Sequence, residues 1–170
     1  MIKWQYYPKS DAIPDHLQNV VNLFEKHSET IDSSRNQLKS NQVLLSLRTD
    51  LQGLEYKVEQ GARIADKIKV PVLFGLNGQL EKSFHVDAFQ ERLGTVLEVE
   101  AGRAVDNFGF LKDLFEACMM HNVLYLIIAV RKTYGRHRQK DFETVVTHFD
   151  TIYASGRLKL PLKGILVIGY

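Results

Sequence analysis

The chain has 170 residues, of which 45% are hydrophobic and 25% charged, a composition that suits one folded domain and excludes a disordered or fibrous chain. No apolar run approaches the roughly 20 residues that cross a bilayer, and the first residues lack the apolar core of a secretory signal. The sequence therefore predicts a cytoplasmic protein without a membrane partner. The single cysteine excludes an internal disulfide, and the net charge of +2 does not by itself indicate nucleic acid.

Two helices are predicted in an N-terminal portion at about residues 11–61. Apolar residues from Ile13 to Phe24 recur at helical spacing, and Pro14 suits a first helical turn. A second, longer helical pattern extends from about Ser40 to Gln60, and the glycine that follows is a plausible stop.

The pattern changes from helical to strand-like near residue 68, where a catalytic core at about 68–170 is expected to begin. Asn77-Gly78 favours a tight hairpin turn, and a second reversal is predicted at Glu91 to Gly94. We expect three antiparallel strands here, the second containing Asp87 and the third containing Glu98 and Glu100.

The remaining segments read as helix, strand, helix and strand. The run VLYLIIAV at 123–130 is apolar without alternation, which indicates a strand covered on both faces. Because the helix at 107–121 would connect the Glu98 strand to this run, the two strands should be parallel. The predicted order is ααβββαβαβ, an α/β fold with a mixed central sheet.

Strand alternation would place Asp87, Glu98 and Glu100 on one face of the sheet, together with His85. Carboxylates this close repel one another, and their folding cost falls when a cation binds between them. Oxygen ligands of this kind suit Mg²⁺, with Mn²⁺ as a substitute. The alternative interpretation is a solvated face of a half-exposed sheet.

A basic stretch, RKTYGRHRQK at 131–140, contains no acid and suits a loop that follows phosphates. The alternative is an ordinary solvated loop. Its cationic residues are Arg131, Lys132, Arg136, Arg138 and Lys140.

An acid on the second strand and the Glu98-Val99-Glu100 pair on the third resemble the PD-(D/E)xK nuclease superfamily. A glutamate in place of the motif's final lysine, followed by AGRAVDNFGFLKDLFEACMMHNVLYLIIAVRKT, resembles the type II restriction endonuclease branch typified by BamHI and BglII. Val86 stands where the motif has its proline. The similarity covers residues 68–135. It implies one nuclease-like domain over 1–170, with a restriction-endonuclease-like three-layer α/β/α fold.

The resemblance also implies a magnesium-dependent endodeoxyribonuclease. Asp87, Glu98 and the Val99 carbonyl would ligate the metal, and Glu100 would accept a proton from the attacking water or bind a second ion. A helical glutamate often completes such sites. Glu59 is preferred over Glu55 for this role, and the alternative is an exposed helical acid.

Double-stranded DNA is the expected substrate, and a homodimer is the simplest way to cut both strands of a symmetric site. Arg103, Arg131 and Lys132 are the expected phosphate contacts, while Arg136, Arg138 and Lys140 would add diffuse attraction. His85 is a possible substrate contact, although a lone histidine is more often structural. Two alternatives stay open: a nuclease-like scaffold that binds DNA or a larger assembly without cutting, and a nuclease for RNA or damaged DNA.

Overall fold

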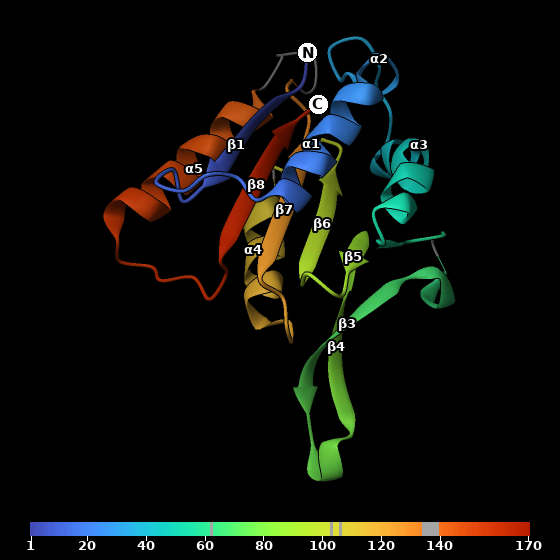
Figure 1. Ribbon diagram of the computed structural model, residues 1–170, viewed down its shortest axis with the longest axis vertical. Helices are drawn as coiled ribbons and strands as arrows, with labels where there is room; N and C mark the ends of the chain where they lie inside the picture. Colours follow the sequence, from blue (N-terminus) through green and yellow to red (C-terminus); the bar gives the residue numbers. More distant parts are fainter. Residues whose placement is uncertain (62, 103, 106, 134–139) are drawn as a thin grey trace.

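A computed structural model of the protein describes residues 1–61, 63–102, 104–105, 107–133 and 140–170 and shows a mixed α/β fold (Figure 1). A six-stranded sheet has the order β1-β8-β7-β6-β5-β2, and β3 and β4 form a separate two-stranded sheet. The six strands are β1 (Lys3–Tyr7), β2 (Lys57–Val58), β5 (Ala88–Gln90), β6 (Thr95–Glu100), β7 (Tyr125–Val130) and β8 (Gly164–Gly169).

The centre of the large sheet is parallel: β6 pairs with β7 and β7 with β8 in the same direction. This confirms the crossover expected from the sequence, because the intervening helices return the chain to the same end of the sheet. The helices are α1 (Asp15–Lys26), α2 (Ser28–Ile31), α3 (Ser40–Gly53), α4 (Gly109–Met119) and α5 (Asp141–Ser155).

Helices cover both faces of the sheet. One buried cluster joins α1 and α3 to Leu97 and Val99 of β6, and the other joins α4 and α5 to Val96 on the opposite face. The apolar run of β7 divides between the two clusters, as expected for a strand that is covered on both sides. Within the described residues, none of the helices has the length and apolar character to span a bilayer.

The sequence prediction missed β1, which pairs antiparallel with β8 at the sheet edge. Its five residues alternate too weakly to reveal a strand, since both Tyr6 and Tyr7 are buried while Lys3 and Trp4 are exposed. The sheet thus gains an edge strand from a segment that precedes the first predicted element.

The second helix was predicted to reach Gln60, and this is wrong: α3 ends at Gly53. Glu55 then adopts a left-handed conformation with φ 65°, and the Tyr56 N–H donates to the Leu51 carbonyl at 3.0 Å, which closes the helix end. The chain continues as β2, which pairs with β5. Val58 belongs to β2 and is buried, and its position in the sequence continues the helical spacing of the apolar residues before it.

The predicted three-stranded meander is confirmed in its antiparallel pairings, β3 with β4 and β5 with β6, but these strands do not form one sheet. Strands β3 (Ile68–Phe74) and β4 (Leu80–Val86) form a hairpin that projects from the body (Figure 1). The turn residues lie where expected, but the loop is a short 3-10 turn at Leu76–Gly78, not a two-residue turn. The predicted middle strand divides at Asp87 into β4 and β5. A second 3-10 turn, Ile64–Asp66, precedes β3.

Candidate functional site

Three carboxylates predicted from the sequence lie near one another: Glu98 and Glu100 on the α4 side of β6, and Asp87 at the edge of the sheet beside a groove next to α3. Glu98 and Glu100 alternate along β6 with Leu97 and Val99, whose side chains belong to the cluster on the other face. Asp87 lies at the bend before β5. Its Oδ2 accepts the Val99 N–H at 2.8 Å, which ties this acid to β6. The Asp87 backbone N–H also favours the ionised form of Glu98, against the effect of burial on its pKa.

The pKa values of these acids show that their charges are poorly compensated. Burial raises the pKa of Asp87 to about 6; the Val99 N–H opposes this shift, while Glu59 and Glu100 add to it. Burial also raises the pKa of Glu98 well above its usual range, and Asp87 adds to it. The site therefore favours protons or a cation over free carboxylates.

A fourth acid, Asp113 of α4, was not singled out from the sequence. Its side chain is 6% exposed, and its Oδ2 has no hydrogen-bond partner among the described residues. Burial raises its pKa to about 8, with Glu100 as the next contribution. A signal was present, since Asp113 falls on the apolar stripe that includes Phe110, Leu114 and Ala117.

Glu59 reaches the site from a different element than predicted. It follows β2 and does not belong to a helix; its N–H donates to the Asp87 carbonyl at 2.8 Å. Its Oε1 lies 2.7 Å from Lys67 Nζ. The sequence prediction extended α3 to Gln60 because Val58 of β2 continues the apolar spacing of that helix. The other candidate, Glu55, forms an ion pair with Arg92 at 2.9 Å and lines a different pocket.

A groove of about 410 Å³ opens beside Asp87. Its lining includes Glu59 and Asp87 as acids and Arg48 and Lys67 as cations, next to the first turn of α3. Arg48 Nη2 donates to the Glu59 carbonyl at 2.9 Å, so it braces the segment after β2. Among Asp87, Glu98, Glu100 and Asp113, Asp87 lines this groove.

The oxygen donors suit a hard cation in their chemistry. The raised pKa values and the unpartnered Asp113 Oδ2 are what a site for a dication shows when only protein atoms surround it. In the part of the chain that the structure describes, however, no group of three or more His, Cys, Asp or Glu side chains is arranged to hold a metal ion. The acids share an electrostatic environment but do not form a coordination shell.

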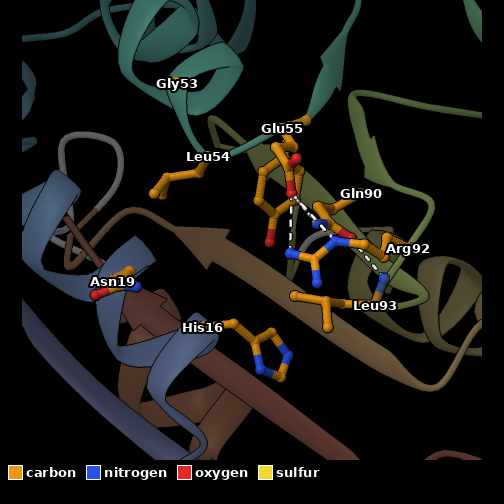
Figure 2. Close-up of a pocket in the computed structure, with 9 residues that line it drawn as sticks. His16, Asn19, Gly53, Leu54, Glu55, Gln90, Arg92 and Leu93 are labelled. Atoms are coloured by element: carbon orange, nitrogen blue, oxygen red, sulfur yellow. Dashed lines mark hydrogen bonds and ion pairs between the residues drawn. The ribbon is translucent and has the colours of Figure 1, made fainter.

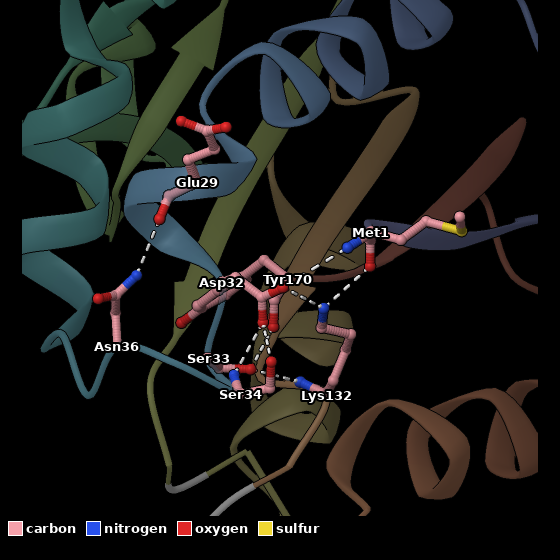
Figure 3. A network of polar contacts seen from close by, with 8 residues as sticks. All are labelled: Met1, Glu29, Asp32, Ser33, Ser34, Asn36, Lys132 and Tyr170. Atoms are coloured by element: carbon pink, nitrogen blue, oxygen red, sulfur yellow. Dashed lines mark hydrogen bonds and ion pairs between the residues drawn. The ribbon is translucent and has the colours of Figure 1, made fainter.

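The two cations predicted to contact phosphates beside the acids make structural contacts instead. Arg131 is 7% exposed, and its Nη2 donates to the Leu38 carbonyl. Lys132 Nζ lies 3.0 Å from Asp32 Oδ2 and donates to the Met1 carbonyl at 2.9 Å (Figure 3). Met1, just before β1, and the segment between α2 and α3 supply these partners, and the sequence placed neither of them here.

Asp32 is held ionised in this network. Burial raises its pKa, but hydrogen bonds from Ser34 and the Lys132 ammonium outweigh burial and keep the pKa well below its usual range. The Lys132 N–H also donates to Ser33 Oγ at 3.0 Å. The network therefore ties the end of β7 to the chain terminus and to the segment after α2 (Figure 3).

The other predicted contacts are placed as follows. His85 is exposed on β4, opposite Lys69. His85 and Asp87 do not lie on one face of a regular strand. Phe84, Val86 and Phe89 pack in one cluster, so the alternation of side chains changes by one residue at the bend. Lys140 is exposed immediately before α5. Arg103, Arg136 and Arg138, which were predicted to bind DNA, lie outside the described residues.

A second pocket of about 220 Å³ lies between α1 and the C-terminal end of α3 (Figure 2). His16 and Asn19 project toward it from α1, and the ion pair of Glu55 and Arg92 borders it. His16 Nε2 is buried without a hydrogen-bond partner among the described residues, and burial lowers the pKa of this imidazole. None of the four clustered acids lines this pocket.

Comparison with known proteins gives no assignment: no family model matches the chain, and neither a curated protein nor a solved structure matches it.

Proposed function

We propose that the protein is a magnesium-dependent endodeoxyribonuclease with a site of the PD-(D/E)xK type. The observation that carries this proposal is the proximity of Asp87, Glu98, Glu100 and Asp113, where burial and mutual repulsion raise the pKa values of three of them. A fold gains no stability from such a cluster unless cations or protons compensate its charge. Metal-assisted phosphodiester hydrolysis is a function for which buried oxygen donors beside an open groove are suited.

The architecture supports the same proposal. A mixed sheet with β6, β7 and β8 parallel, a crossover through α4 and helices on both faces agrees with a restriction-endonuclease-like core. In that arrangement Asp87 lies directly before β5, and Glu98 and Glu100 lie on β6, so the pairing of β5 with β6 fixes the spacing of these three acids.

Each acid has a distinct part in the proposed reaction. Asp87, Glu98 and the Val99 carbonyl would hold Mg²⁺, with Asp113 near enough to Glu98 to influence its pKa. When bound, the ion would polarise the phosphate and favour ionisation of water. Glu100 would accept the proton of the attacking water or bind a second ion, and Glu59 would keep Lys67 beside Asp87.

The test is cleavage of supercoiled plasmid in Mg²⁺, in Mn²⁺ and in EDTA. We expect nicked and linear products with the metal ions and none in EDTA, and at least a 100-fold slower rate for Glu98→Gln, because this change removes a charged metal ligand. Glu91→Gln is the matched control, since Glu91 pairs with Lys57 at an exposed position. Equal rates for the two variants would contradict the assignment of Glu98.

A second function, DNA binding or assembly by a nuclease-like scaffold without cleavage, is favoured by one observation: the described acids do not converge as a coordination shell. It predicts duplex binding in EDTA and no heat on titration with Mg²⁺, even in the presence of DNA. The proposed nuclease would act most simply on both strands as a homodimer, which sedimentation with duplex DNA would test.

A further inference from the structure

We propose that Lys67 is a substrate-binding residue whose ammonium holds a phosphate of the DNA strand in the groove beside Asp87. This inference rests on the proposed nuclease function. A DNA strand that approaches four carboxyl groups is repelled, and a fixed cation next to the acids offsets that repulsion. The sequence analysis looked for this cation after β7; the structure points to a lysine that precedes β3.

Lys67 is held beside the acids by a short chain of contacts. Its Nζ lies 2.7 Å from Glu59 Oε1, and the Glu59 N–H donates to the Asp87 carbonyl at 2.8 Å. Lys67 and Asp87 both line the groove of about 410 Å³. Glu59 thus orients the lysine without itself being required to contact DNA.

The ammonium remains accessible. The Lys67 side chain is 30% exposed, whereas the side chain of its partner Glu59 is 13% exposed. An ammonium has three N–H donors, so Lys67 can keep its bond to Glu59 and donate to two phosphate oxygens. The salt bridge therefore pre-orients the cation, which lowers the conformational entropy that DNA binding costs.

The other described cations near the acids are less suited to this role. Arg48 lines the groove, but its guanidinium donates to the Glu59 carbonyl. Lys112 Nζ lies 3.3 Å from Glu116 on the exposed surface of α4, and it does not line the groove. Lys132 is bound to Asp32. Among the described lysines, Lys67 both lines the groove and lies beside the acids, through its contact with Glu59.

The experiment compares Lys67→Gln and Lys67→Arg with the control Lys57→Gln, which removes an exposed cation paired with Glu91 at 2.6 Å. Binding of a fluorescent 20-base-pair duplex is measured by anisotropy in EDTA over a range of salt concentrations, and plasmid cleavage is measured in Mg²⁺. For Lys67→Gln we expect roughly 3- to 10-fold weaker binding, a salt slope smaller by about one, and cleavage slower by about 100-fold. Lys67→Arg should keep most of the binding, because it keeps the charge.

Folding is separated from binding by a double variant. Lys67→Gln alone leaves Glu59 without its cation, so Glu59→Gln/Lys67→Gln removes both charges and keeps the contact neutral. We expect this variant, checked by circular dichroism, to bind DNA as weakly as Lys67→Gln.

Two results would overturn the inference in different ways. If the parent protein cuts DNA and Lys67→Gln binds and cuts like Lys57→Gln, the role of Lys67 is refuted and the nuclease remains. If the parent neither cuts nor binds DNA, the proposed function fails, and the role of Lys67 fails with it.

Discussion

Replacing Asp113 with asparagine should stabilise the metal-free protein, and more so as the pH rises. In the folded state burial raises the pKa of Asp113 to about 8 from an ordinary 3.8. Between these values the folded protein retains a proton that the unfolded chain releases, so the free energy of unfolding falls as the pH rises. Each pH unit costs at most about 1.4 kcal/mol.

The magnitude follows from this pH window. The full shift of roughly four units corresponds to an upper limit of about 6 kcal/mol at pH 8, and a buried amide without partners costs about 1–3 kcal/mol in turn. We therefore expect Asp113→Asn to be up to about 3–5 kcal/mol more stable than the parent at pH 8, and equal or less stable at pH 4.5, where the parent carboxyl is protonated in the fold.

Urea denaturation in EDTA at pH 4.5, 6 and 8 measures this difference. Glu91→Gln is the control, because Glu91 is 70% exposed in its ion pair and its replacement should change stability by no more than about 0.5 kcal/mol at any of these pH values. A stability gain that does not increase between pH 4.5 and 8 would refute the argument that burial raises the pKa of Asp113.

Two further predictions concern stability away from the acids. Lys132→Met should lower the free energy of unfolding by about 3 kcal/mol in urea denaturation, because it leaves the nearly buried Asp32 without its cation. Lys132→Met combined with Asp32→Asn should recover much of this loss. No recovery would show that the loss comes from packing and not from charge. Gly94→Ala should lower the free energy of unfolding by about 2–4 kcal/mol, since the φ of Gly94 is +60° and an added Cβ would lie 2.3 Å from the Asn122 carbonyl oxygen. Gly78 has φ +74° and open space around it, so Gly78→Ala should cost about 1 kcal/mol. Equal losses at the two glycines would rule out the clash as the cause.

Local patterns predicted much of the fold. Apolar periodicity located α1, α4 and α5, and the uninterrupted apolar run located β7 and its parallel partner β6. The patterns failed where a short segment obtains its hydrogen bonds from a distant one. β1 exists as a strand because β8 lies beside it, and Val58 is buried by β5, not by a longer helix.

The candidate site divides in the same way. The alternation of Glu98 and Glu100 with apolar neighbours was sufficient to place both on one face, because side chains alternate along every strand. No local pattern could show that Arg131 and Lys132 bind Leu38 and Asp32, since these partners are about a hundred residues away along the chain.

The sequence by itself determined where α1, α4, α5, β6 and β7 lie and which face of β6 carries the acids, because these properties depend on neighbours a few residues apart. The tertiary structure alone decided that Asp113 joins the acids, that Glu59 arrives after a strand and that Lys67 accompanies it. Those placements depend on contacts between segments that are distant in sequence, and on a loss of solvent that appears only when the helices cover the sheet.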